Sequence, residues 1–268
     1  MQARLEGIKS IDLTKFLKHV NLYDSDLPDK FKKNFVNWIL SSKLNSIKGL
    51  DNFNHISLTN GSIQIFDHFY LKYYQRRFRF FKDEFMYHKA VCKHGRDYKF
   101  IEDDFIRSYD VVIISVPFTR KGKIHPDMFD ILDACEESQI PVLLDFAHFP
   151  VAKNINVDLT KYQCIETLAF SLSKFCYGAE YLRIGVRMQK ENTDDGIDVF
   201  NSSGIEMFSR INIDIANQLI NEYDVDYNWN AFGSTYSNVC KKNNLKECDN
   251  ILMGFNKDER IIISQKIT

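Results

Sequence analysis

The sequence predicts an α/β fold in which helices cover a mostly parallel sheet, with a smaller C-terminal α+β unit. Short apolar segments alternate with segments of helical periodicity, as in chains that build a parallel sheet. The apolar segments lack a polar face, which is typical of strands covered on both sides. With 268 residues, the chain can bury a core of one or two domains.

The N-terminal part predicts helices before the first strand. Residues 13–20 and 28–40 have helical periodicity, and the second segment has proline in its first turn. A strand is expected at residues 55–58, followed by a helix at 63–74. The basic cluster at residues 75–79 is interpreted as the solvated end of this helix.

The central part predicts the sheet itself. Its expected elements are a strand at 110–116, a helix at 126–137, and strands at 140–145 and 164–170. The polar loop at 190–196 marks a boundary, after which a helix at 205–223 and a closing strand at 260–264 are expected; residues 224–244 are not assigned. The expected divisions are an N-terminal helical segment (1–45), a large domain (46–189) and a small domain (190–268).

Composition excludes several classes of protein. Lys and Arg number 35 and Asp and Glu 36, so no basic surface for nucleic acid is expected. The apolar runs, such as 111–116, are too short to span a membrane. Six cysteines without a CxxC pair, and no apolar signal segment, predict reduced thiols in the cytoplasm. No Cys/His spacing indicates a metal site.

One lysine and one acid follow two of the predicted strands. Asp145 ends the strand at 140–145, and Lys174 follows the strand at 164–170 within Ser171-Leu172-Ser173-Lys174. Ligands of parallel sheets gather at the carboxyl ends of strands. A lysine that forms an imine and an acid that faces a ring nitrogen are what pyridoxal 5'-phosphate requires.

The order of these motifs resembles the fold type I pyridoxal-phosphate enzymes, in particular the class I/II group of histidinol-phosphate and aspartate aminotransferases. The matching segments are Asp145-Phe146-Ala147-His148, Ser171-Leu172-Ser173-Lys174 and Arg183-Ile184-Gly185. The chain would be a shortened version of that family. The resemblance implies a homodimer that binds pyridoxal phosphate, an amino donor and a keto acceptor.

The resemblance also implies roles for single residues. Lys174 would form the Schiff base and shuttle a proton, and Asp145 would stabilise the protonated ring. Phe85 would stack on the ring, and Arg260 would hold the substrate carboxylate. Tyr23 lies near the family's tyrosine that reaches the neighbouring subunit's phosphate. The implied phosphate ligands are Gly61, Ser62, Ser171, Ser173 and Arg183.

Two departures from the family concern the cofactor's ring oxygen. The family's asparagine is replaced by Thr119, within Val116-Pro117-Phe118-Thr119-Arg120-Lys121-Gly122, and threonine is shorter. The family's tyrosine is replaced by His148, which can still donate a hydrogen bond through a ring nitrogen.

Each of these residues also has an ordinary structural interpretation. Lys174 could be an exposed turn residue, Asp145 a cap, His148 a core or surface histidine, Phe85 part of the core, and Arg260 a flank of a buried strand. Aminotransfer is the favoured function. The alternatives are decarboxylation, β-elimination or cyclisation with the same cofactor, or a non-catalytic relative. Retention of both Lys174 and Asp145 argues against lost catalysis.

Overall fold

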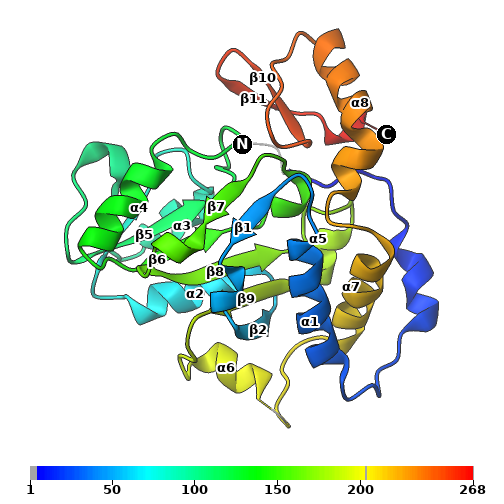
Figure 1. The fold of residues 1–268 in the computed structure, drawn as a ribbon, viewed down its shortest axis with the longest axis horizontal. Coiled ribbons are helices and arrows are strands. Elements are labelled where there is room, and N and C mark those ends of the chain that lie inside the picture. Colours follow the sequence, from blue (N-terminus) through cyan, green and yellow to red (C-terminus); the bar gives the residue numbers. More distant parts are fainter. Residues whose placement is uncertain (1–4, 203, 268) are drawn as a thin grey trace.

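The computed structural model describes residues 5–202 and 204–267, and a seven-stranded sheet forms its centre (Figure 1). The strand order is β2-β9-β8-β6-β5-β3-β4, and β9 runs opposite to the other six strands of this sheet. The strands are β2 (His55–Thr59), β3 (Arg77–Phe80), β4 (Tyr98–Phe100), β5 (Asp110–Ser115), β6 (Val142–Asp145), β8 (Ile165–Ser171) and β9 (Gly185–Gln189). The predicted mostly parallel α/β fold is confirmed.

Helices cover both faces of this sheet. Along β5, Val112 and Ile114 pack in one apolar cluster with α1, α4 and α7, whereas Val111 and Ile113 pack in another with α2 and α3. Alternate residues of a strand face opposite sides, so β5 is buried on both faces. The helices are α1 (Leu27–Leu40), α2 (Ser62–Lys72), α3 (Met86–Cys92), α4 (Met128–Glu137), α5 (Ala179–Leu182), α6 (Gly196–Asn201), α7 (Arg210–Glu222) and α8 (Tyr227–Lys242).

A second core joins the two ends of the described chain. Leu5 and Ile8 pack with α8 and with the antiparallel pair β10–β11, which Figure 1 shows at one end of the molecule. The unassigned residues 224–244 contain α8. By contrast, α7 packs on α1 in the main core. The remaining elements are β1 (Ser46–Lys48), β7 (Asn156–Asp158), β10 (Met253–Asn256), β11 (Glu259–Ile262) and the 3₁₀ turns η1 (Leu13–His19), η2 (Leu50–Asn52), η3 (Ile101–Asp103), η4 (Phe149–Val151), η5 (Leu159–Lys161) and η6 (Ser264–Lys266).

Two predicted helices differ from the observed ones. The segment at 13–20 is a 3₁₀ helix, whose start is capped by Asp12 through the Thr14 amide. The helix expected from residue 205 begins instead at Arg210, because the Ser209 hydroxyl caps it by accepting from the Asn212 amide. The domain boundaries given above remain a prediction.

The basic cluster at residues 75–79 was interpreted wrongly as a solvated helix end. Helix α2 ends at Lys72, and Arg77 and Arg79 belong to β3 in the interior of the sheet. Arg79 and Asp110 are both fully buried, and Arg79 Nη1 lies 2.7 Å from Asp110 Oδ2. A buried charge is tolerated when it is paired and hydrogen-bonded, which explains how this cluster fits in a strand.

Replacing Arg79 with lysine is expected to lower the free energy of unfolding by about 2 kcal/mol. The guanidinium also donates to the carbonyl oxygens of Lys99, Phe105 and Phe100 at 3.1, 2.7 and 3.1 Å, and an ammonium cannot reproduce that fork. Urea unfolding measures the change. The matched control is Arg107→Lys on the exposed surface; an equal loss in both variants would contradict the prediction.

Within residues 5–202 and 204–267, no helix has both the length and the apolar character needed to cross a membrane.

Candidate active site at the strand ends

Three neighbouring parallel strands of the sheet have polar residues at their carboxyl ends. Ser115 ends β5, Asp145 ends β6 and Ser171 ends β8, and Ser115 is in register with Asp145. A cavity of about 620 Å³ lies at these strand ends. Ten of the predicted site residues line it: Ser62, Phe85, Thr119, Asp145, His148, Ser171, Ser173, Lys174, Arg183 and Arg260. The chain therefore brings most of the predicted site together.

Lys174 and Asp145 line the same cavity from adjacent strands. Lys174 Nζ donates a hydrogen bond to the Leu5 carbonyl oxygen at 2.6 Å. Asp145 is 6 % exposed, and its Oδ1 accepts from the Ala147 amide at 2.9 Å. Burial raises the pKa of Asp145 to about 7, the nearby Glu84 carboxyl adds to the rise, and Lys174 opposes it. The Asp145 carboxyl can therefore hold or release a proton near neutral pH.

Glu84 is a further buried acid of the site that the sequence analysis missed. It lies between β3 and α3, and its Oε1 accepts from the Ser115 hydroxyl at 2.5 Å and from the Phe85 amide at 2.9 Å. Its Oε2 accepts from the Ser115 amide at 3.0 Å. Burial raises the pKa of the Glu84 carboxyl, although these hydrogen bonds oppose the rise. In the sequence Glu84 follows another acid in a short loop, which is typical of solvated residues.

A cradle for an anion forms where β2 meets α2. Gly61 has a φ of +86°, and a Cβ there would lie 2.5 Å from Arg183 Nη2. Arg183 Nη2 in turn donates to the Asn60 carbonyl oxygen at 3.2 Å. Glycine suits this positive φ and leaves room for the guanidinium close to the start of α2, where Ser62 lies. Helix N-termini and arginine together suit a phosphate.

The Ser171-Leu172-Ser173-Lys174 turn lies beside this cradle. Ser171 Oγ accepts from the Ser173 amide at 3.2 Å and donates to the Ile184 carbonyl oxygen at 3.3 Å. Ser171 is buried, and both serines line the cavity. These bonds fix the turn that carries Lys174.

His148 is neutral and has a defined tautomer. The Asn250 amide group donates to His148 Nδ1 at 2.8 Å, and Asn250 Oδ1 accepts from the Leu252 amide, which fixes the orientation of the Asn250 side chain. Burial, Lys174 and Arg260 lower the pKa of His148 to about 3. The ring proton is therefore on Nε2, which is the nitrogen left to donate a hydrogen bond. Asn250 was not singled out in the sequence, where no motif surrounds it.

Arg260 reaches the cavity from the second core. It lies on β11, and its Nη1 donates to the Thr119 carbonyl oxygen at 3.2 Å. Burial and the nearby Arg120 lower the pKa of Arg260. The Thr119 hydroxyl donates to Glu84 Oε1 at 3.3 Å, so this side chain is engaged with an acid of the site.

The two aromatic residues of the prediction differ in position. Phe85 directly precedes α3 as its N-cap residue and lines the cavity, with its ring 6.1 Å from that of Tyr87. Tyr23 is 94 % exposed and is not a lining residue of the cavity. Its contact with a neighbouring subunit remains a prediction.

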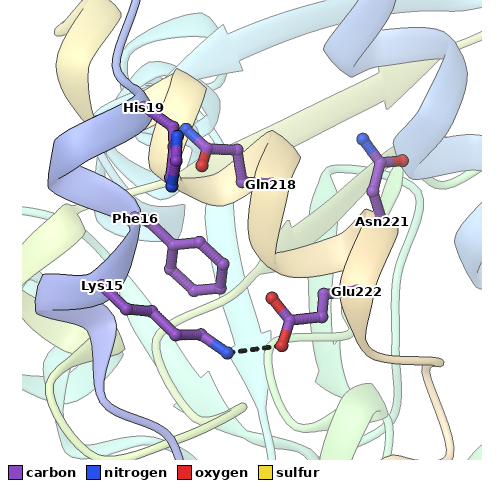
Figure 2. Close-up of a pocket in the computed structure, with 6 residues that line it drawn as sticks. All are labelled: Lys15, Phe16, His19, Gln218, Asn221 and Glu222. Carbon is purple, nitrogen blue, oxygen red and sulfur yellow. Dashed lines mark hydrogen bonds and ion pairs between the residues drawn. The ribbon is translucent and has the colours of Figure 1, made fainter.

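A second pocket lies between η1 and α7, away from the strand ends (Figure 2). Figure 2 shows Lys15 and Glu222 pointing toward each other, and they form an ion pair. Both side chains are more than a third exposed, so solvent screens the pair. None of the predicted site residues lines this pocket.

Comparison with known proteins shows the fold. No family model matches the sequence, and no curated protein matches it significantly. Among solved structures, the pyridoxal-phosphate-bound C-S lyase from Staphylococcus hominis matches with a TM-score of 0.65 at 9% identity, over 90% of this chain and 71% of that chain. The histidinol-phosphate aminotransferase from Clostridium acetobutylicum matches with a TM-score of 0.57 at 15% identity, over 90% and 76% of the two chains.

A third neighbour extends the range of reactions. The L-threonine-O-3-phosphate decarboxylase from Porphyromonas gingivalis matches with a TM-score of 0.62 at 13% identity, over 92% of this chain and 83% of that chain. The chain therefore has the fold of the fold type I pyridoxal-phosphate-dependent enzymes, as the sequence predicted.

Proposed function

We propose that this protein is a pyridoxal-phosphate-dependent aminotransferase that moves an amino group between an amino acid or amine and a keto acceptor. The observation that carries the proposal is that Lys174 and Asp145 line the same cavity as the anion cradle of Gly61, Ser62 and Arg183. Pyridoxal phosphate has an aldehyde, a ring nitrogen and a phosphate, and these residues offer an amine, an acid and an anion site in one space. The neighbours of known structure support the choice of cofactor.

The bound cofactor would supply an electrophilic aldehyde and an electron-withdrawing ring. The chain's residues do the rest. Lys174 Nζ would hold the cofactor covalently and, once displaced by substrate, would take and return a proton as general base and acid. The Asp145 carboxylate would keep a proton on the ring nitrogen. His148 would donate from Nε2 to the ring oxygen, in place of the family's tyrosine.

Further residues that line the cavity would bind the remaining groups of the cofactor. The Ser62, Ser171 and Arg183 side chains would hold the phosphate, with Ser173 supporting the turn, and Phe85 would cover one face of the ring. Thr119 takes the place of the family's asparagine but donates to Glu84. The hydrogen bond to the cofactor's ring oxygen is therefore assigned to His148.

Arg260→Lys is expected to raise the KM for the amino acid roughly 10- to 100-fold. Lysine cannot make the two parallel hydrogen bonds of a guanidinium to the α-carboxylate, and one hydrogen bond to a charged group is worth about 1.5–3 kcal/mol. Steady-state kinetics measure the change. A similar loss in kcat with unchanged KM would contradict a carboxylate-binding role.

Exposure of the loaded protein to a panel of amino acids and amines tests the reaction type. Transamination predicts that a donor converts the cofactor to its amine form, with loss of the visible absorption band and formation of a keto product. Release of carbon dioxide, or of a group from the substrate's β-carbon, would assign decarboxylation or elimination instead. Those reactions occur in neighbours that share the fold.

A homodimer is part of the proposal. Leu17, Tyr23, Tyr177 and Tyr181 expose 54, 94, 40 and 65 % of their surface, on or near η1 and α5. Leu13 of η1 lies close to Gly178 at the start of α5, so the two elements are adjacent. If these side chains form one patch, that patch is the candidate dimer interface. The cytoplasmic location expected from the sequence remains a prediction.

A further inference from the structure

Glu84 is a buried carboxyl that the proposed chemistry does not use. It is 8 % exposed, and it comes from the β3–α3 connection, whereas Asp145 comes from the end of β6. Two acids with separate origins in the fold meet at Ser115. Ser115 Oγ lies 2.5 Å from Glu84 Oε1 and 3.4 Å from Asp145 Oδ2.

The hydrogen-bond donors around Glu84 determine how a proton can move between the Glu84 and Asp145 carboxyl groups. The Phe85 and Ser115 amides donate to Glu84 from fixed positions, one to each oxygen. The Ser115 hydroxyl, by contrast, can rotate and can donate or accept. It is the only direct bridge between the two carboxyl groups among the described residues.

This bridge permits two arrangements of one proton. If Asp145 is protonated, Asp145 donates to Ser115 and the Ser115 hydroxyl donates to Glu84. If Glu84 is protonated, Glu84 donates to Ser115 and the hydroxyl donates to Asp145. All three groups are hydrogen-bonded in either arrangement. Two ionised carboxylates would instead repel each other in a buried site, so one shared proton is favoured.

We propose that Glu84 and Asp145 form a coupled carboxyl pair that shares one proton through Ser115, and that Glu84 is a positioning residue which acts on the bound cofactor through Asp145. The second part rests on the proposed function. With the cofactor bound, the shared proton stays on Glu84, and Asp145 is then the single carboxylate that faces the protonated ring nitrogen.

The other charged groups around the cavity act on the pair in known directions. Lys174 lowers the pKa of Asp145, whereas Glu84 and burial raise it. His148 is neutral at physiological pH because its pKa is lowered to about 3. Arg260, Arg120, Arg183, Lys82, Lys89, Asp83 and Glu180 also line the cavity. All of these residues are the same in the variants below, so they do not account for differences between them.

Carbon NMR of the full-length protein without cofactor, labelled at aspartate carboxyl carbons, tests the pair directly; Asp145→Asn identifies the signal. The parent is expected to titrate near the pKa of about 7. Glu84→Gln should lower that pKa by about one unit or more, because the neighbouring charge is gone. Ser115→Ala should raise it, because a hydrogen bond to the carboxylate is lost. The control Glu137→Gln, an exposed acid at the end of α4, should not change it.

Opposite shifts in the two variants distinguish the pair from general damage. If both variants lower the pKa, the site has only become more hydrated, and the proposal is overturned. An unchanged pKa in Glu84→Gln also overturns it. This titration needs no cofactor, so failure of the proposed function would be seen separately, as absence of a cofactor absorption band in the parent.

The positioning role has its own measurement in the loaded protein. Glu84→Gln is expected to shift the pH midpoint at which the absorption of the bound cofactor changes, relative to the parent and Glu137→Gln. An unchanged midpoint, together with a shifted Asp145 pKa in the protein without cofactor, would overturn the claim that Glu84 acts on the cofactor through Asp145.

Discussion

Lys174→Ala is expected to reduce turnover by at least about 10⁴-fold, since it removes both the covalent attachment and the general base. The Lys174 amine lies at the end of β8, in the cavity that also contains Asp145 and the anion cradle. Lys174 is close enough to that acid for its charge to lower the pKa of Asp145. The variant should also lose the visible absorption band that the parent forms with pyridoxal phosphate. Absorption spectra and initial rates measure both effects.

The fold should tolerate this change. Lys174 Nζ donates a hydrogen bond to the Leu5 carbonyl oxygen, and alanine leaves that oxygen beside the cavity. The matched control is Lys161→Ala, an exposed lysine of η5 that should retain both the band and the activity. A Lys174→Ala variant that keeps the band would contradict the assignment of the lysine.

Asp145→Asn is expected to have opposite effects on stability and on activity. In the protein without cofactor, burial raises the pKa of Asp145 from its ordinary value of 3.8 to about 7. The folded state therefore binds the proton more tightly than the unfolded state, and the free energy of unfolding falls as pH rises through this interval. The difference corresponds to about 4 kcal/mol once pH exceeds the folded pKa.

Asparagine has no carboxylate to bury, so the variant should be more stable than the parent by up to about 4 kcal/mol near pH 8, with little difference near pH 4. Its activity should nevertheless fall, by roughly 10²-fold or more, because the ring nitrogen loses the carboxylate that keeps it protonated. Urea unfolding at both pH values, alongside kinetics, measures the pair of effects. A stability difference that is the same at both pH values would contradict the raised pKa.

The sequence was sufficient for the parts of the fold that follow from local periodicity. The strand segments ending at Ser115, Asp145 and Ser171 are apolar on both faces, and such strands belong in a covered parallel sheet. Parallel strands place their carboxyl ends along one edge, so the proximity of Asp145 and Lys174 followed from their positions in the chain.

Other parts of the site depend on contacts between distant segments. Glu84 and Arg79 are charged residues that look solvated in the sequence, and only the packing of β3 beside β5 supplies their partners, Ser115 and Asp110. Asn250 orients His148 across the second core, from about a hundred residues away in the chain. Periodicity does not report such pairs, because each partner alone is compatible with an exposed position.

Helix α8 was unassigned for a different reason. Its sequence contains many Asn, Tyr and Ser residues, which have modest helix propensity. Its helical state depends on packing of Trp229, Tyr236 and Cys240 in the second core. Tertiary burial thus overrides the weak local preference.

The most direct test of the account is to treat the protein loaded with pyridoxal phosphate with borohydride, which fixes the cofactor to its amine, and to map the modified residue by peptide mass spectrometry. A single modified peptide with the cofactor on Lys174 is expected. Modification that is absent, or that lies on surface lysines without Lys174, would contradict the claim that this cavity is a pyridoxal-phosphate site.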